Sequence, residues 1–161
     1  MLNRRTFLQL SSTIAAGTIL TRCGERSTMN ATTPLNRIGL QLFSIPKLLE
    51  QDFAGTLKMI AQIGYKEVEF YGPYPFSAAE DIERWKSVSP SLGFSGSGFF
   101  GHTVQQVKKM LDDNGLSAPS LHTNLATLKQ RMSEMAEVAH VLGTTYVVLP
   151  SAETQPNLDA Y

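Results

Sequence analysis

The chain has 161 residues, enough for one domain with a hydrophobic core, and its 42% hydrophobic and 17% charged residues are ordinary for a globular protein. The formal net charge is zero, but residues 1–30 are basic and the rest of the chain carries 10 basic and 13 acidic side chains, a net charge of −3. An acidic body argues against general nucleic-acid binding, which needs a basic surface. The chain has a single cysteine, Cys23, which excludes an internal disulfide. It has no uninterrupted apolar run of about 18 residues, so an ordinary transmembrane helix is not predicted.

Residues 1–30 resemble a bacterial export signal. Arg4 and Arg5 precede a moderately apolar run, and the stretch Asn-Arg-Arg-Thr-Phe-Leu-Gln is similar to the twin-arginine motif. A basic N-terminus followed by an amphipathic helix is the alternative. Cys23 is the candidate lipidation site, although Arg22 departs from the small residue expected before a lipidated cysteine. We therefore expect residues 1–30 to be a signal and tether, with export by the twin-arginine route to the periplasm or another extracytoplasmic location.

From residue 37 onward, the patterns of strand and helix alternate. Apolar runs predict strands at residues 38–43, 65–71, 118–121 and 145–149. Apolar residues at helical spacing predict helices between them, with Asp52 and Thr103 as N-caps, at residues 53–63, 104–113 and 125–142. Such alternation favours parallel βα units, which close either as a doubly wound sheet or as a (β/α)8 barrel.

Residues 72–102 interrupt this alternation and are interpreted as an insertion after the second strand. Ser77 and Glu80 have the spacing of a capping box before a short helix. The spacing Gly-x-Gly-x-x-Gly at residues 96–101 is that of a nucleotide-binding loop, but no strand precedes it, so we favour a flexible loop. The aromatic residues of the insertion could form part of a substrate wall or pack its own small core, and we favour the second for Trp85, Phe94, Phe99 and Phe100.

The body of the chain also resembles the xylose-isomerase-like barrels, a family often called sugar phosphate isomerases/epimerases. The resemblance covers roughly residues 37–150 and rests on the stretches IGLQLFSI, GTLKMIAQIGYKEVEFYG, LDDNGLSAPSLHTNL and AEVAHVLGTTYVVLP. It implies a (β/α)8 barrel, which needs about 250 residues. We therefore expect residues 31–161 to be the N-terminal half of such a barrel, truncated to about the first four βα units. The metal ligands and proton-transferring residues of the family are expected in the C-terminal half, so the catalytic residues stay unknown and no metal ligand is assigned here.

Polar residues near the strand ends are the candidate substrate-binding residues, because a barrel displays its chemistry there. His122 ends the third strand, where the family resemblance implies a histidine in the substrate pocket; a backbone-bonded histidine is the alternative. Glu69 lies late in the second strand, and Gln41 interrupts the first. Asn124 could orient ligand hydroxyls or cap the following helix. Glu67 shares the face of Glu69, with an ion pair near the strand start as its alternative role.

The resemblance implies an exported sugar or sugar phosphate isomerase or epimerase, with metal-assisted proton transfer next to a carbonyl. The full-length family member is expected to use divalent Mn, Mg, Co or Zn. This chain alone is expected to bind no metal and to be inactive. The alternatives are a non-catalytic or decayed half-barrel, a keto-glycoside lyase or hydrolase of the same superfamily and, least favoured, an apurinic endonuclease.

The expected partners follow from the same interpretation. The ligand is a small-molecule sugar or sugar derivative, nucleic acid is not a partner, and contact with a membrane is limited to the signal or a lipid anchor. The first and fourth strands would be unpaired edges, which predicts self-association.

Overall fold

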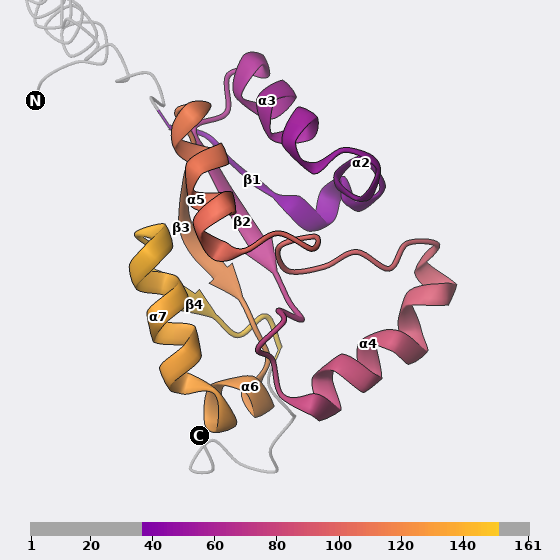
Figure 1. Cartoon of the computed structure of the whole chain (residues 1–161). Helices are drawn as coiled ribbons and strands as arrows, with labels where there is room; N and C mark the ends of the chain where they lie inside the picture. The colour runs from indigo at the N-terminus through magenta and orange to yellow at the C-terminus, as the bar shows by residue number, and fades with distance from the viewer. Residues whose placement is uncertain (1–36, 152–161) are drawn as a thin grey trace, which may run out of the picture. The chain divides into compact units, whose positions relative to one another are not determined.

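The structure, a computed structural model, describes residues 37–151. These residues contain a parallel sheet of four strands in the order β1-β2-β3-β4 (Figure 1). The strands are β1 (Gly39–Gln41), β2 (Glu67–Tyr71), β3 (Ser117–His122) and β4 (Tyr146–Val148). Each strand pairs with the next one along the chain, so β1 and β4 are the edges of the described sheet. The prediction of parallel βα units is confirmed.

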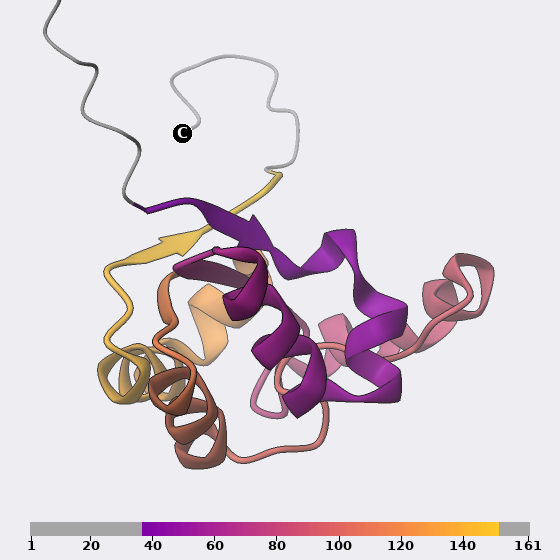
Figure 2. The same cartoon turned by 90° about the horizontal axis from the view of Figure 1, so that it is seen from above.

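Helices connect the strands, and some of them cover one face of the sheet. After the short 3-10 helix η1 (Leu42–Ser44), they are α2 (Pro46–Gln51), α3 (Phe53–Ile63), α4 (Ala79–Leu92), α5 (Val104–Asp113), α6 (Leu125–Gln130) and α7 (Met132–Leu142). Figure 2 shows α3, α5 and α7 together on one side of the strands. Among residues 37–151, no helix has the length and apolarity that a membrane crossing requires.

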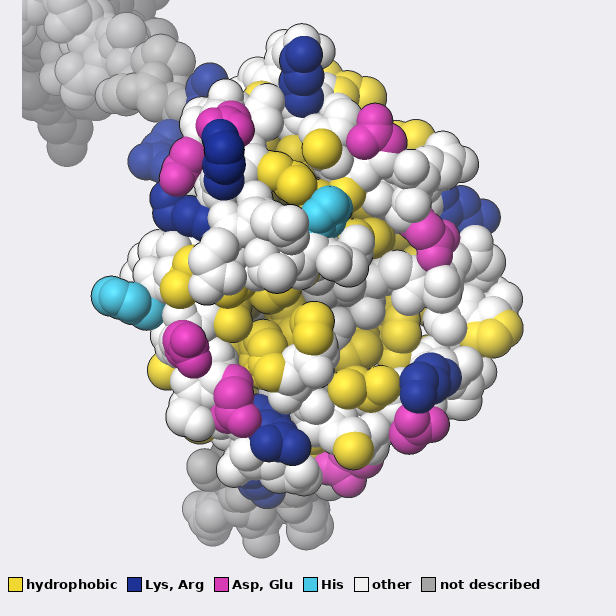
Figure 3. Space-filling model, in the orientation of Figure 1, with side chains coloured by type: hydrophobic (Ala, Val, Ile, Leu, Met, Phe, Trp, Pro, Cys, Tyr) yellow, Lys and Arg dark blue, Asp and Glu magenta, His cyan; other side chains and the backbone are white. Residues whose placement is uncertain are grey.

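The two faces of the sheet differ in chemistry because side chains alternate along each strand. Val68, Phe70 and Leu121 are buried under the helices and join one core with side chains of α3, α5 and α7. Glu69 and His122 lie on the opposite face and are only half-buried. On the helix-covered side, Figure 3 shows hydrophobic side chains gathered near the centre, with charged side chains mostly around them. The polar face of the sheet is therefore the one that carries the candidate site residues.

Several predicted helix ends are confirmed in detail. Asp52 caps α3 by accepting a hydrogen bond from the backbone N–H of Gly55 at 2.9 Å. Thr103 and Gln106 form the reciprocal capping box that opens α5. Gly143 ends α7 with a φ of 72°, a left-handed conformation that glycine adopts without steric cost.

Two predicted elements are wrong in extent. The first strand ends at Gln41 rather than at residue 43, because the Gln41 side chain accepts the N–H of Phe43 and turns the chain into η1. The predicted helix 125–142 is two helices, α6 and α7, separated at Arg131, whose φ of −133° and ψ of 33° are not helical. The apolar period continues across the break, so the pattern did not reveal it.

The predicted capping box of the insertion is also wrong. The Ser77 hydroxyl accepts a hydrogen bond from the N–H of Tyr74 at 2.9 Å, so it stabilises the preceding turn instead of capping a helix. α4 begins at Ala79, and its N-cap residue Ala78 has no side-chain hydrogen bond. The helix itself is longer than the short helix that the sequence predicts.

Candidate functional site

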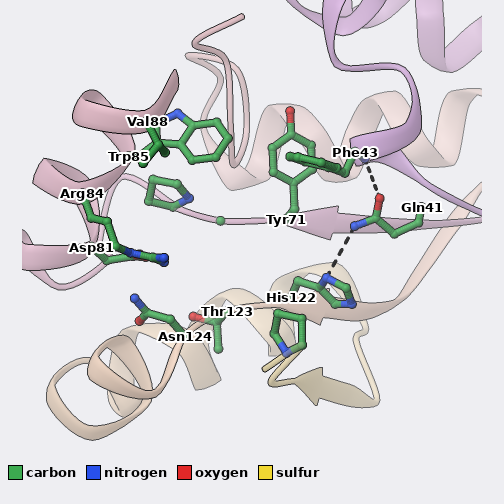
Figure 4. A pocket seen from close by; sticks show the side chains of 13 residues that line it. Gln41, Phe43, Tyr71, Asp81, Arg84, Trp85, Val88, His122, Thr123 and Asn124 are labelled. Carbon is green, nitrogen blue, oxygen red and sulfur yellow. Dashed lines mark hydrogen bonds and ion pairs between the residues drawn. The ribbon is translucent and has the colours of Figure 1, made fainter. Parts of the chain in front are cut away.

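A pocket of about 410 Å³ lies where the polar face of the sheet meets the insertion (Figure 4). The ends of β1, β2 and β3 contribute Gln41, Tyr71 and His122 to its lining. The segment after β3 contributes Thr123 and Asn124. The rest of the lining includes Asp81, Arg84, Trp85 and Val88 of α4. The pocket therefore lies at the carboxyl ends of parallel strands, where barrels and open α/β sheets bind their ligands.

The structure brings the four predicted substrate-binding residues together. Gln41, His122 and Asn124 line the pocket directly. Glu69 does not line it, but its Oε1 lies 2.9 Å from Nε2 of His122. The side chains of Glu69 and His122 are each 23% exposed. Residues more than 80 positions apart in the sequence thus meet at one end of the sheet.

Hydrogen bonds around His122 determine which of its ring nitrogens carries the proton. Gln41 Oε1 accepts the N–H of Phe43 at 2.6 Å, which directs the amide nitrogen of Gln41 toward Nδ1 of His122 at 3.4 Å. An amide NH2 can only donate, so Nδ1 must accept and the proton of the neutral ring lies on Nε2. Nε2 then donates to Glu69 Oε1, and Glu69 Oε2 accepts the hydroxyl of Ser120. The carboxylate and the imidazole hold each other in one orientation.

Two other predicted residues have clear structural partners. Glu67, at the start of β2, pairs with Arg37 at 2.7 Å, which is the alternative role that the sequence suggested. Asn124 caps α6, because its Oδ1 accepts the N–H of Thr127 at 2.8 Å. This cap does not remove Asn124 from the pocket lining. Asn124 can therefore cap α6 and still contact a ligand in the pocket.

The aromatic residues of the insertion divide between the pocket and the core. Phe99 is 3% exposed and packs against Phe70 of β2, so it belongs to the main core and not to a small core of the insertion, as the favoured interpretation had it. Trp85 lines the pocket instead, with its ring 6.2 Å from that of Tyr71. Phe94 packs between Phe43 and Trp85, at centroid distances of 5.6 and 5.8 Å. Trp85 is therefore part of the pocket wall, which is the alternative that the sequence analysis did not favour, and Phe94 packs against it.

The loop that follows α4 is fastened to α2 by Glu50. One carboxylate oxygen of Glu50 accepts hydrogen bonds from the N–H of Ser95 at 3.0 Å, the hydroxyl of Ser95 at 2.7 Å and the N–H of Gly96 at 2.9 Å. These bonds, led by that from the Ser95 hydroxyl, hold the pKa of Glu50 below its ordinary value. The same loop accepts the indole N–H of Trp85 on the Ser95 carbonyl at 2.7 Å. Glu50 thus positions the loop against which Trp85 rests.

Tyr71 connects β2 to the same loop. Its hydroxyl donates to the carbonyl of Gly96 at 2.9 Å, and its ring packs at 5.1 Å from that of Phe43. Burial, followed by the nearby charge of Glu50, raises the pKa of Tyr71 far above its ordinary value. The Tyr71 hydroxyl therefore stays protonated and acts as a fixed donor.

Sequence reasoning missed three polar residues of the pocket. Asp81 is 5% exposed and accepts a hydrogen bond from Arg84 at 3.0 Å, one turn along α4. The spacing of an acid and a base three residues apart was a readable signal for this pair. Thr123 is also 5% exposed, and no signal in the sequence separates it from an ordinary loop residue.

The described residues do not fit a metal centre by themselves. Within residues 37–151, no three His, Cys, Asp or Glu side chains lie close enough together to hold a metal ion. Glu69 and His122 are adjacent, but the ring donates its Nε2 proton to the carboxylate, so that nitrogen has no lone pair for a metal. The predicted signal residues Arg4 and Arg5 and the candidate lipidation residue Cys23 lie outside the described residues.

Comparisons with known proteins agree with the fold. No protein-family model matches the chain, and no curated protein matches it significantly. A solved sugar phosphate isomerase/epimerase from Parabacteroides distasonis is 25% identical with a TM-score of 0.51, over 80% of this chain and 43% of that one. A second sugar phosphate isomerase/epimerase from the same organism is 22% identical with a TM-score of 0.47, over 74% of this chain and 44% of that one. A xylose isomerase domain containing protein from Salmonella typhimurium is 16% identical with a TM-score of 0.43, over 71% of this chain and 36% of that one.

The coverage agrees with the predicted half-barrel. The chain spans less than half the length of each of these three solved proteins. Its four strands are parallel and pair in chain order, as consecutive strands of a (β/α)8 barrel do. The predicted resemblance is thus confirmed at the level of structure, and the described residues have a sugar phosphate isomerase/epimerase fold, a partial (β/α)8 barrel consistent with its N-terminal half.

Proposed function

We propose that this chain is part of an exported sugar or sugar phosphate isomerase or epimerase, and that residues 37–151 supply one side of its substrate pocket. The observation that carries the proposal is the network of Gln41, His122 and Glu69 at the carboxyl ends of three parallel strands. Those strands belong to a sugar phosphate isomerase/epimerase fold. The reaction would be proton transfer next to a carbonyl, the chemistry that interconverts sugars.

In this proposal the described residues bind and orient the substrate. The contact from Gln41 to Nδ1 of His122 is long, at 3.4 Å, so a sugar hydroxyl that donates to Nδ1 can replace it. The charge of Glu69 keeps the imidazole ring in place while this exchange occurs. A divalent metal, which the family resemblance implies, would have to find its ligands outside residues 37–151, so we propose no metal-dependent step for the described residues.

One other function has an observation in its favour. The pocket extends over α4 beyond the strand ends, which suits a keto-glycoside lyase or hydrolase that uses the same proton abstraction. We place both activities outside the cytoplasm, because the twin-arginine-like segment with Arg4 and Arg5 would export the protein. The two activities differ in product: an isomerase or epimerase leaves the carbon skeleton and any glycosidic bond intact, whereas a lyase or hydrolase releases the aglycone.

Hydrogen exchange tests the proposal. The protein purified from the cells that encode it would be incubated in deuterated water, in the presence of divalent metals, with a panel of free keto- and aldo-sugars, their phosphates and keto-glycosides. Nuclear magnetic resonance would then follow deuterium at the carbon next to the carbonyl. Incorporation that is lost in the His122→Ala variant supports the proposal. Absence of exchange with every sugar of the panel would contradict it.

A further inference from the structure

The end of the pocket remote from the strand ends is polar and has no role in the proposed reaction. Figure 4 shows Gln41 and His122 at one end of the pocket, and Asp81 and Arg84 of α4 opposite Asn124 at the other. A sugar whose carbonyl lies near His122 would extend from the strand ends toward α4. The hydroxyls of that sugar farthest from the carbonyl would then meet this second group of side chains.

The hydroxyl of Thr123 lacks a partner that a ligand can supply. Two buried hydroxyls have no hydrogen-bond partner among residues 37–151, those of Tyr74 and Thr123, and of the two it is Thr123 that lines the pocket. Its backbone is held in place, because its N–H donates to the carbonyl of Val148 at 2.9 Å. A buried polar group without a partner needs an explanation. A hydroxyl both donates and accepts, so this position suits a hydroxyl of a ligand.

Asp81 adds an acceptor at the same end of the pocket. Its side chain is only 6% exposed, although the residue lines the pocket. Its Oδ1 accepts a hydrogen bond from Arg84 at 3.0 Å, and within residues 37–151 its other carboxylate oxygen accepts none. That oxygen can accept a bond from a ligand hydroxyl, whereas the charge of Asp81 repels a second anion.

The positive charge at this end is already paired. Arg84 is the one lysine or arginine among the described residues that line the pocket, and it forms an ion pair with Asp81. A phosphate bound here would have to compete with the carboxylate of Asp81 for the guanidinium. This end of the pocket therefore favours an uncharged ligand group over a phosphate.

Asn124 completes the group with a donor. Its Oδ1 accepts the N–H of Thr127 at 2.8 Å, which leaves the amide nitrogen to donate to a ligand. Figure 4 shows this nitrogen directed toward the side of the pocket formed by α4. Asp81, Asn124 and Thr123 thus offer an acceptor, a donor and a group that does both. Sugar hydroxyls donate and accept, so they match this set, whereas a phosphate dianion only accepts.

We propose that Asp81, Thr123 and Asn124 form a hydroxyl-binding cluster that holds the end of the sugar farthest from its carbonyl. The substrate is then a free sugar with an unmodified terminal hydroxyl rather than a sugar phosphate. The terminal hydroxyl donates to Asp81, and Thr123 and Asn124 bond to the hydroxyls beside it. This inference rests on the proposed function in placing the carbonyl near His122, and it adds the residues that select the substrate.

Binding measurements on the full chain test the hydroxyl-binding cluster. Trp85 lines the pocket and is the one tryptophan of the chain, so its fluorescence reports binding. The probes are glucose, galactose, mannose and fructose, each as the free sugar, the 6-deoxy sugar and the 6-phosphate. We expect at least one free sugar to bind about tenfold more tightly than its 6-deoxy form, the effect of one hydrogen bond to a charged acceptor. Its 6-phosphate should bind no better than the 6-deoxy form.

Two variants separate recognition from a structural role. Asp81→Asn should narrow the gap between the free sugar and its 6-deoxy form, and should improve binding of the 6-phosphate, because the charge of Arg84 is no longer compensated. Thr123→Val should weaken binding of the free sugar severalfold without making the fold less stable in urea, because the hydroxyl that it removes has no partner among residues 37–151. Glu80→Gln is the matched control, since it removes an exposed carboxylate from the same helical turn, outside the pocket lining, and it should change neither gap.

Several results would overturn the cluster. They are equal binding of free and 6-deoxy sugars, tighter binding of a 6-phosphate, binding of no free sugar, and an unchanged affinity in Thr123→Val. Deuterium exchange in sugars that shows no preference for a free terminal hydroxyl would leave the proposed function intact and refute only the cluster. Selective binding of a free sugar, lost in Asp81→Asn but without any deuterium exchange, would support the cluster and contradict the proposed reaction.

Discussion

Replacing Glu50 should loosen the wall of the pocket without removing a hydrogen bond of Gln41, His122 or Glu69 at the strand ends. One oxygen of Glu50 accepts three hydrogen bonds from Ser95 and Gly96, and the same loop holds the indole of Trp85. A hydrogen bond to a buried charged group contributes about 1.5–3 kcal/mol, but Glu50 is exposed and water can replace its partners. Because water weakens the contribution of these exposed hydrogen bonds, we expect Glu50→Ala to lower the free energy of unfolding by only about 1 kcal/mol in total.

The pH dependence of this effect has a definite sign. The folded state lowers the pKa of Glu50 below 4.5, so the carboxylate stabilises the fold fully above that value. The contribution is lost as the pH falls through the lower pKa of the folded state. The stability difference between wild type and Glu50→Ala should therefore be full at neutral pH and shrink under acid conditions below 4.5.

Urea denaturation at several pH values, with Trp85 fluorescence recorded in the native state, measures both effects. Release of the loop should shift the Trp85 emission to longer wavelength, because the indole loses its contact with Ser95 and meets water. Glu137→Ala, a change of an exposed glutamate on α7, is the matched control. An unfolding free energy equal to that of wild type at neutral pH would refute the reasoning, as would a loss that does not diminish in acid.

Three further predictions follow from single features of the chain. Tyr74→Phe should raise the free energy of unfolding by about 1 kcal/mol in urea denaturation, because the Tyr74 hydroxyl is buried without a partner among the described residues; a less stable variant would show that the hydroxyl has a partner. Arg4→Lys combined with Arg5→Lys should keep the protein inside the cell in a fractionation experiment, because a receptor recognises the arginine pair itself and not only its positive charge. Unchanged export would contradict the predicted route. The unpaired edges β1 and β4 of the described sheet should cause concentration-dependent self-association in light scattering; a monodisperse monomer at all concentrations would contradict it.

The elements that the sequence predicted best are those whose signals are local. The Asp52 cap and the capping box of Thr103 and Gln106 each depend on residues within one helical turn. The break at Arg131 could not be predicted in this way. It interrupts an apolar period that continues on both sides. The hydroxyl of Thr127 in α6 accepts a hydrogen bond from the backbone N–H of Ala78 in the insertion, a contact between distant parts of the chain.

The candidate site was predictable only where a strand ends. His122, Gln41 and Glu69 were found because polar residues stand out in short apolar strands, and the parallel order brings them together. The pocket wall was harder to predict, because the placement of α4 depends on tertiary contacts that leave no periodic pattern. In the sequence, Asp81 has the pattern of an ordinary acidic residue in the first turn of a helix, and only the folded structure shows that it lines the pocket.

The measurement that tests the central claim most directly is nitrogen NMR of the histidine side chains, with and without the sugars and glycosides of the panel. The account predicts that His122 of the free chain carries its proton on Nε2, and that a bound sugar shifts the Nδ1 resonance as its hydroxyl replaces Gln41. His140, exposed on α7, should not respond. A proton on Nδ1 in the free chain, or His122 signals that no sugar or glycoside changes, would contradict the claim that this network forms the sugar-binding end of the pocket.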